Sequence, residues 1–326
     1  MLKAVFINDG CPVIKGAHVI DLVYGLGRRE KLAGMVDLYP VIITSDSLEA
    51  HRDELKDVDV VFSTWGFPRL DESQLDLMPN LKAVFYAAGA TGTFRDPLLQ
   101  RGIRISSATV ANAIPVAEYA LSHVLLAGAG FYRNSRECTD PENARMVNSF
   151  RGHGNYANRV AVLGNGAISR KLQGFLSHHE IEVLEVASRE RKRTVSLEEA
   201  FSTCYAVVNL FPDVEDNGGV YDRALFESMI DSAVFINCGR GRQVNEDDLI
   251  SVFKIRTDLT AILDVQWPEP PLAGSELYTL PNVFLSSHIA GSKASELVRM
   301  GDYMLADFEH FKRGKPLEYE VIAGQL

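Results

Sequence analysis

Cysteine is scarce in this sequence, and its spacing gives no sign of a metal site or a disulfide framework. The 326 residues include four cysteines, and no two of them stand in a Cys-x-x-Cys pair. Scattered single cysteines are typical of reduced thiols. We therefore expect no disulfide and no bound metal. The four are Cys11, Cys138, Cys204 and Cys238.

Positive charge is also low. The chain has 33 Lys and Arg residues against 43 Asp and Glu residues, a formal net charge of −10, and no lysine-rich tail. Proteins that bind nucleic acid need a basic face for the phosphates. The composition therefore argues against a nucleic acid as a partner.

Long apolar runs are missing as well. We find no stretch that approaches the roughly 20 apolar residues needed to cross a bilayer. The first residues, MLKAVFIND, hold one lysine and four consecutive apolar residues, which indicates a first strand rather than a signal peptide. A cytoplasmic protein with no membrane partner is the expectation.

The sequence is instead rich in short β-branched runs separated by polar, helix-compatible segments. Alternating strands and helices indicate parallel sheets covered on both faces, and 326 residues suffice for two such domains. Five strands are predicted in the first third and six in a second alternation. The predicted strands are Lys3–Asp9, Pro40–Ser45, Val60–Trp65, Leu81–Ala88 and Ile103–Ala108, then Val160–Leu163, Ile181–Val186, Ala206–Leu210, Ala233–Asn237, Leu259–Leu263 and Val283–Leu285.

Two longer helices are predicted to join these alternations. One runs from Ile114 to Phe131, with Pro115 in its first turn, and connects the two domains. The other, Ser292–Phe311, follows the last strand and returns the chain to the first domain. The first domain is then discontinuous.

A glycine-containing turn follows the first strand of the second alternation. In VLGNGAIS, Gly164 permits a sharp turn and Gly166 lets the backbone approach a ligand, while the helix that begins near Ala167 favours an anion at its N-terminus. The third glycine of the dinucleotide-binding pattern is replaced by Ser169. The turn predicts nucleotide binding, with an ordinary glycine turn as the alternative.

Several segments together resemble the D-isomer-specific 2-hydroxyacid dehydrogenase family. Besides the glycine turn, they are MPNLKAVFYAAGATG, NAIPVAEYAL, INCGRGRQVNEDDL, ILDVQWPEPP and LPNVFLSSHIAGS. The resemblance implies an α/β protein of two doubly wound parallel-sheet domains with the active site in the cleft between them. These are a flavodoxin-like substrate domain, residues 1–110 and 293–326, and a Rossmann cofactor domain, residues 111–292.

The resemblance also implies three catalytic residues, Arg240, Glu269 and His288. A guanidinium can hold the carboxylate and carbonyl of a 2-keto acid, so Arg240 would orient the substrate. His288 would exchange the proton that accompanies hydride transfer. A carboxylate beside the imidazole favours its protonated form and fixes the ring, which is the role implied for Glu269.

The cofactor is predicted to be NADP(H) rather than NAD(H). The position where NAD-preferring proteins carry an acid falls on Ala187, and the residues that follow are Ser188 and Arg189; an arginine there can meet a 2′-phosphate. Glu185 is the alternative acid if the strand ends earlier. The predicted cofactor-binding residues are Gly164, Asn165, Gly166, Ala167, Ile168, Ser188, Arg189, Cys238 and Asp264.

The substrate carboxylate is predicted to meet the backbone of Ala88, Gly89 and Ala90, together with Arg240. The substrate is then a small 2-keto or D-2-hydroxy acid, and the resemblance implies a homodimer through the helix predicted at Ile114–Phe131. Two alternatives remain open on the same fold. One is a relative that oxidises formate or phosphite, and the other is a nucleotide-sensing interaction protein of the co-repressor type.

Overall fold

The computed structural model describes residues 1–11, 16–214 and 217–322. The chain divides into two compact units, one formed by residues 1–113 with the C-terminal segment that begins at Ser292, and the other by residues 114–291. These boundaries lie within three residues of the predicted ones. The last four residues of the predicted first domain, 323–326, lie outside the described part.

The first unit contains a five-stranded parallel sheet in the order β2-β1-β3-β4-β5. This is the flavodoxin-like order of a doubly wound sheet. The strands are β1 (Lys3–Ile7), β2 (Asp37–Ile43), β3 (Val60–Ser63), β4 (Ala83–Tyr86) and β5 (Arg104–Ser107).

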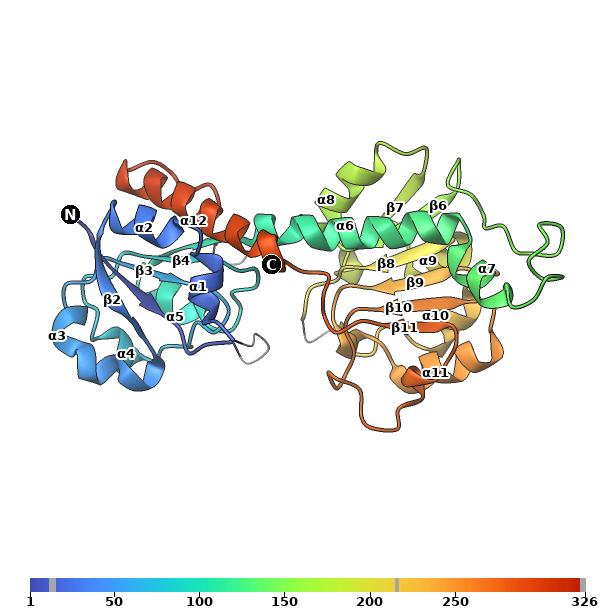
Figure 1. Cartoon of the computed structure of the whole chain (residues 1–326), viewed down its shortest axis with the longest axis horizontal. Coiled ribbons are helices and arrows are strands. Elements are labelled where there is room, and N and C mark those ends of the chain that lie inside the picture. Colours follow the sequence, from blue (N-terminus) through green and yellow to red (C-terminus); the bar gives the residue numbers. More distant parts are fainter. Residues whose placement is uncertain (12–15, 215–216, 323–326) are drawn as a thin grey trace. The chain divides into compact units, whose positions relative to one another are not determined.

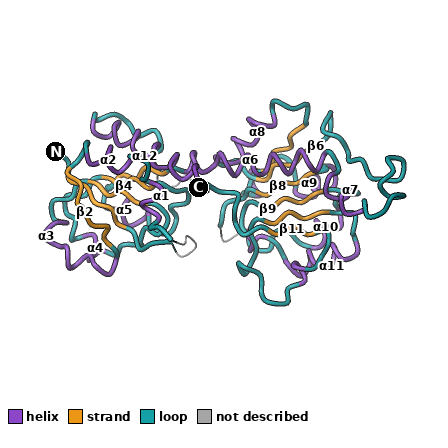
Figure 2. Tube along the Cα trace, viewed as in Figure 1, coloured by secondary structure: helices purple, strands orange, loops and turns teal. Residues whose placement is uncertain are grey.

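Helices cover both faces of this sheet (Figures 1 and 2). Alternate residues of β1 face opposite sides, so Phe6 joins one buried cluster and Val5 and Ile7 join the other. The α-helices of this unit are α1 (Val19–Val23), α2 (Arg28–Ala33), α3 (Arg52–Leu55), α4 (Glu72–Leu75), α5 (Arg95–Gln100) and α12 (Leu297–Lys312).

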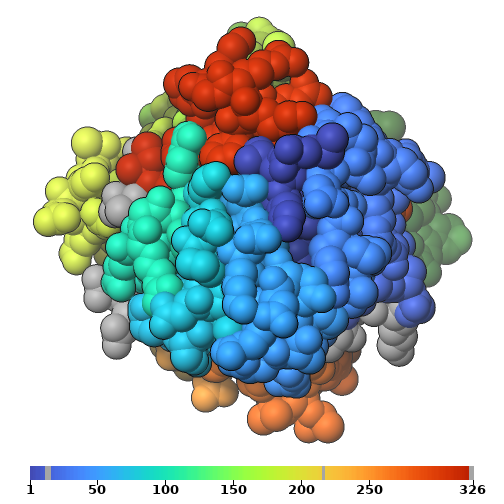
Figure 3. Space-filling model, turned by 90° about the vertical axis from the view of Figure 1, so that its left-hand side faces the viewer, coloured from blue at the N-terminus to red at the C-terminus, as the bar shows by residue number. Residues whose placement is uncertain are grey.

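Helix α12 belongs to the first unit although it lies at the far end of the sequence. Its Phe308 packs against Phe62 and Phe85 of the sheet, and its Asp302 pairs with Arg28 at 2.6 Å. Figure 3 shows the red C-terminal segment against the blue N-terminal one. Helix α12 therefore completes the core of the first unit.

The second unit contains a six-stranded parallel sheet in the order β11-β10-β9-β8-β6-β7. Strand β6 has β7 on one side and β8 on the other, so the strand order reverses between β6 and β8, and ligands bind at the carboxyl ends of strands at such a point. The strands are β6 (Arg159–Leu163), β7 (Glu182–Val186), β8 (Ala206–Asn209), β9 (Val234–Asn237), β10 (Thr260–Leu263) and β11 (Val283–Leu285).

The count of six strands agrees with the prediction, but the order differs from that of a full dinucleotide-binding sheet. In the usual order the second strand has a third strand at its outer side, whereas here β7, the second strand of this unit, is the edge of the sheet. Here the segment after β7 is polar and forms the 3₁₀ turn η2 (Glu190–Lys192) before α9. The helices of this unit are α7 (Phe131–Glu137), α8 (Ala167–Leu176), α9 (Leu197–Thr203), α10 (Arg223–Ser228) and α11 (Glu246–Ile255).

Helix α6 (Thr109–Gly128) carries the chain from the first unit into the second. It begins five residues earlier than predicted, directly after β5, so Pro115 lies inside the helix and not in its first turn. Proline there removes one backbone N–H that would bond the carbonyl of Ala111. The helical residues on either side keep the helix continuous.

Helix α6 also corrects the expectation about long apolar stretches. By length and composition alone it could cross a membrane, and 44% of its most apolar window is buried inside the protein. Its residues Val116, Ala120 and Val124 pack against the sheet of the second unit. These contacts make α6 a core helix of that unit.

Candidate functional site

His288 and Glu269 form a hydrogen-bonded pair at the carboxyl edge of the second sheet. His288 follows β11 and Glu269 follows β10, and His288 Nδ1 lies 2.8 Å from Glu269 Oε1. The side chains are 51% and 36% exposed. The partner at Nδ1 orients the ring, and Nε2 is the nitrogen left to exchange a proton with another molecule.

His288 has an unusual backbone conformation. Its φ of 57° lies in the left-handed region, which a non-glycine residue adopts only when its surroundings hold it there. Here the backbone of Asp264 supplies part of that hold, because the N–H of His288 donates to its carbonyl oxygen at 3.0 Å.

The carboxylate of Asp264 fixes the rest of the histidine loop. It is 1% exposed, and its oxygens accept hydrogen bonds from Ser286 Oγ (2.7 Å), the N–H of Ile289 (2.8 Å) and the N–H of Ala290 (3.0 Å). These donors lie on both sides of His288. Asp264 was predicted to bind cofactor, and in the structure its carboxylate holds the histidine loop.

Helix α6 contributes one more link to this loop. Tyr119 Oη lies 2.9 Å from Ser286 Oγ. Since the one Ser286 hydroxyl proton is donated to Asp264, the Tyr119 hydroxyl must be the donor in that contact. Burial raises the pKa of Tyr119 to about 12, so it stays a neutral donor.

Arg240 lies in the turn after β9. Its side chain is 41% exposed, Nη1 donates to the Gly239 carbonyl at 2.8 Å, and Nε lies 3.8 Å from Asp213 Oδ2. Asp213 also pairs with Arg242 at 2.5 Å. Arg240 is therefore a solvent-accessible cation, and Asp213 is an acidic neighbour that sequence reasoning missed.

The backbone of the Arg240 turn is tightly enclosed. A Cβ at Gly241 would lie 1.9 Å from the carbonyl oxygen of Gln266, and a Cβ at Gly239 would lie 2.6 Å from Asn209 Nδ2. Only glycine fits at either position. The first contact also brings the Arg240 turn against the loop that carries Glu269.

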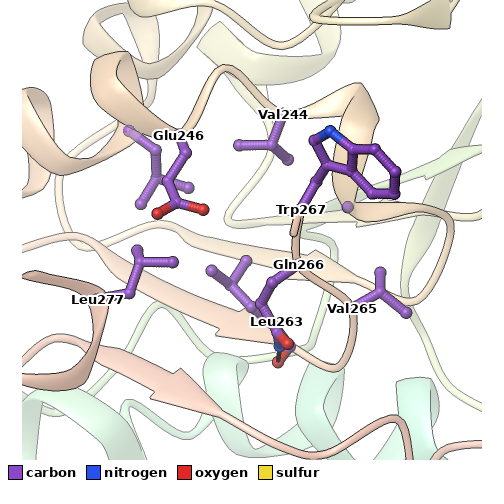
Figure 4. Close-up of a pocket in the computed structure, with 9 residues that line it drawn as sticks. Val244, Glu246, Leu263, Val265, Gln266, Trp267 and Leu277 are labelled. Carbon is purple, nitrogen blue, oxygen red and sulfur yellow. Dashed lines mark hydrogen bonds between the residues drawn. The ribbon is translucent and has the colours of Figure 1, made fainter. Parts of the chain in front are cut away.

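A small pocket lies beside this contact (Figure 4). Gly241, Gln266 and Trp267 line it together with Glu246, the first residue of α11. Burial raises the pKa of the Glu246 carboxyl, while a hydrogen bond from Ser275 Oγ at 3.0 Å acts in the opposite direction.

The glycine turn after β6 has the features that a dinucleotide phosphate requires. Gly164 has φ 120°, and a Cβ there would lie 2.8 Å from the carbonyl oxygen of Leu210. Gly166 is the N-cap of α8 without a side-chain cap, and a Cβ there would meet nothing within 4 Å. The predicted residues Asn165, Ala167 and Ile168 surround this open helix start.

Ser169 fits the same interpretation. It is fully buried, and its Oγ has no hydrogen-bond partner. A Cβ built at Gly164 would lie 3.0 Å from Ser169 Oγ, so this unpaired hydroxyl is adjacent to the glycine turn. The residues present therefore fit a bound dinucleotide.

The tip of β7 carries no acid. The strand ends at Val186, and the Glu185 carboxylate accepts from Gln173 Nε2 of α8 at 2.9 Å. Arg193 braces the tip by donating to the carbonyls of Ala187 (3.0 Å) and Ser188 (3.2 Å). Ser188 is half-buried and Arg189 is exposed.

Cys238, the remaining predicted cofactor residue, begins the turn after β9. Its side chain is 8% exposed and belongs to a buried apolar cluster. Burial, and to a smaller extent the Asp264 carboxylate, raises the pKa of its thiol. Cys238 is therefore a neutral thiol in the core. All four cysteines of the chain are free.

The predicted carboxylate-binding residues Ala88, Gly89 and Ala90 follow β4 in the first unit. Hydroxyls of Ser107 and Thr109 donate to the Gly89 carbonyl at 2.8 and 2.9 Å, which fixes this turn. Within the described part of the chain, the N–H groups of Gly89 and Ala90 donate to no protein acceptor. Two adjacent free donors suit an anion.

No metal centre is formed by the residues that the structure describes, because they contain no group of three or more His, Cys, Asp and Glu side chains able to hold an ion.

Comparison with known proteins adds to this geometry. Residues 122–290 match the model of the D-isomer specific 2-hydroxyacid dehydrogenase, NAD binding domain. The chain is 28% identical over 207 residues to YoaD of Bacillus subtilis, which is 59% of each chain. It is 25% identical over 281 residues to a glyoxylate reductase of Thermococcus gammatolerans, covering 82% of this chain and 84% of that one.

Among solved structures, a phosphoglycerate oxidoreductase from Rhizobium etli has the same fold, with a TM-score of 0.77 and 19% identity over 99% of this chain and 98% of that one. The matched family model covers more than half of the sequence. The chain therefore belongs to the D-isomer specific 2-hydroxyacid dehydrogenase family, and the matched residues form its NAD-binding domain. This confirms the family and the fold class that the sequence segments indicated.

Proposed function

We propose that the protein reduces a small 2-keto acid, or oxidises the corresponding D-2-hydroxy acid, with a nicotinamide dinucleotide. The observation that carries this proposal is the His288–Glu269 contact of 2.8 Å. A histidine paired with a carboxylate at the carboxyl edge of this parallel sheet supports the proposal, because reduction of a carbonyl there needs a proton donor.

Each residue has a distinct role in this proposal. The guanidinium of Arg240 binds the substrate carboxylate and orients its carbonyl. The free N–H groups of Gly89 and Ala90 are suited to an anionic group. Residues 164–168 hold the dinucleotide phosphates. When bound, the dinucleotide supplies the hydride. His288 then protonates the developing alkoxide from Nε2, and Glu269 stabilises the imidazolium before the transfer.

A panel of 2-keto acids tests this function. Glyoxylate, hydroxypyruvate, pyruvate, and branched and aromatic acids are offered with NADPH and with NADH, and the absorbance of the reduced cofactor is followed. We expect at least one acid to be reduced at an ordinary enzymatic rate of about 1 per second or more. No turnover with any acid and either cofactor would refute the proposal.

We also propose that the preferred cofactor is NADP(H). An acid at the tip of β7 would repel a 2′-phosphate, but that position is Ala187, followed by Ser188 and Arg189, and the carboxylate of Glu185 is engaged by Gln173. The Arg189→Ala substitution should lower the ratio of kcat/KM with NADPH to that with NADH about tenfold, whereas Arg191→Ala, two residues further, should leave it unchanged. A wild-type protein whose kcat/KM with NADH equals or exceeds that with NADPH would contradict the preference.

The homodimer and the cytoplasmic location stay predictions. Helix α6 and the residues after it expose Leu126 and Phe131, which are 38% and 50% accessible. Size-exclusion chromatography with light scattering would measure the oligomeric state, and a monomer would contradict the predicted dimer.

A further inference from the structure

Three buried amide side chains lie directly beneath the Arg240 turn. Asn209 ends β8, Asn237 ends β9, and Gln243 ends the 3₁₀ turn η4 (Gly241–Gln243) that follows Arg240. Each has no exposed surface. A buried amide is costly unless its donors and acceptors are paired. The hydrogen-bond partners of these three amides therefore identify the backbone segments that they fix in place.

The amide of Gln243 has the most informative partners. Its Oε1 accepts from the N–H of Arg240 at 3.0 Å and from Asn209 Nδ2 at 2.8 Å. Its Nε2 donates to the carbonyl of Pro212 at 2.9 Å. Two donors on one side and a carbonyl on the other fix the orientation of the amide.

Asn209 completes the connection. Its Oδ1 accepts from Tyr221 Oη at 2.7 Å and from the N–H of Phe211 at 3.0 Å. Its Nδ2 also donates to Asn237 Oδ1 at 2.8 Å. All of its donors and acceptors are therefore used, and they join the loop after β8 to the turn after β9.

The same loop also contacts the glycine turn. The N–H of Leu210 donates to the Leu163 carbonyl at 2.9 Å, and the Leu210 carbonyl blocks any Cβ at Gly164. The backbone of Leu210 thus holds the glycine turn, whereas the side-chain amides of Gln243 and Asn209 hold the Arg240 turn.

We infer that Asn209 and Gln243 are positioning residues for Arg240. Their amides fix the Arg240 backbone against the loop after β8, and from that fixed point the guanidinium reaches the substrate carboxylate. This inference rests on the proposed function, because it assumes that Arg240 binds the substrate.

Glyoxylate is the best probe for this role. It has no side chain beyond its carboxylate and aldehyde, so its KM depends on the contacts made to those two groups. The Gln243→Met substitution keeps the length of the side chain and removes both hydrogen-bonding groups, leaving the Arg240 N–H without an acceptor. We expect the KM for glyoxylate to rise about tenfold and the KM for the dinucleotide to stay within about twofold.

Gln243→Glu separates positioning from mere stability. A glutamate keeps an acceptor for the Arg240 N–H, but it buries a carboxylate and loses the donor to Pro212. It should therefore melt at a lower temperature than the methionine variant while raising the glyoxylate KM less. If Gln243 only stabilised the fold, the less stable variant would show the larger change in KM.

Asn282 offers a matched control for Asn209. It is 1% exposed in the same unit, and its Nδ2 donates to the carbonyls of Phe253 (3.0 Å) and Leu259 (3.1 Å), away from Arg240. Asn209→Leu should raise the glyoxylate KM, whereas Asn282→Leu should lower the melting temperature and leave the KM unchanged. Equal KM changes in the two variants would overturn the inference.

Arg240→Ala distinguishes failure of this inference from failure of the proposed function. If it leaves the glyoxylate KM unchanged, Arg240 does not bind the substrate, and both the proposed role and the inference fall. If Arg240→Ala raises the KM and Gln243→Met does not, only the positioning role is wrong.

Discussion

Asp264→Asn is the substitution whose effect can be worked out most fully from the structure. The aspartate carboxylate accepts three hydrogen bonds within the histidine loop and is 1% exposed. Asparagine keeps one oxygen and puts an NH₂ group in place of the other, so at least one donor of the loop faces another donor. The expected result is a less stable protein with a displaced His288.

The size of the effect follows from the bonds involved. Losing one hydrogen bond to a charged acceptor costs about 1.5–3 kcal/mol, and the unpaired buried donor costs about 1–3 kcal/mol more. The lower end of this sum, about 3 kcal/mol, corresponds to a fall of about 6–12 °C in the melting temperature of a unit of this size. A displacement of His288 by about 1 Å would lower kcat about 100-fold.

Differential scanning calorimetry and steady-state kinetics measure these two effects, and Asp307→Asn is the matched control. Asp307 is also 1% exposed, lies in the first unit, and accepts from Ser106 Oγ (2.5 Å) and the N–H of Glu318 (2.7 Å). Its variant should lose stability and keep its kcat. The reasoning is refuted if Asp264→Asn leaves kcat unchanged, or if it weakens dinucleotide binding and does nothing else.

Two further substitutions test the glycine turn and the pocket beside Arg240. Gly166→Ala should leave the melting temperature unchanged, since its Cβ enters open space, yet raise the dinucleotide Kd at least tenfold in fluorescence titration; an unchanged Kd would remove Gly166 from the site. Burial raises the pKa of the Glu246 carboxyl in the folded protein. Its neutral form therefore stabilises the fold below the ordinary pKa, at about pH 4, and this stabilisation is lost as the pH rises through the folded-state pKa. Glu246→Gln should therefore melt above wild type at pH 8 and lose that advantage at pH 4, and an equal difference at both pH values would contradict the assignment.

The strands and the paired loops were accessible from the sequence because their signals are local. β-Branched runs such as Val60–Ser63 form strands wherever both faces can be buried. His288 and Glu269 were found through segments that resemble a family, and the structure places them in contact. The pairing of His288 with Glu269 was predicted from the family resemblance, because no local sequence signal joins two residues 19 positions apart.

The amide network under Arg240 could not be predicted in this way. Asn209 and Gln243 lie 34 residues apart, and each reads in the sequence as an ordinary polar residue near a strand end. Their burial and pairing appear only when β8 and β9 lie side by side. Pro115 shows that a local signal can also mislead. A proline favours a helix start, but the packing of α6 tolerates this one inside the helix.

His288→Ala tests whether His288 is the proton donor in reduction of a keto acid. Initial rates with the best acid of the panel and dinucleotide affinity are measured on the same preparation. We expect turnover to fall at least about 100-fold and the dinucleotide Kd to stay within about twofold of wild type. A variant that keeps its turnover would contradict this role of His288.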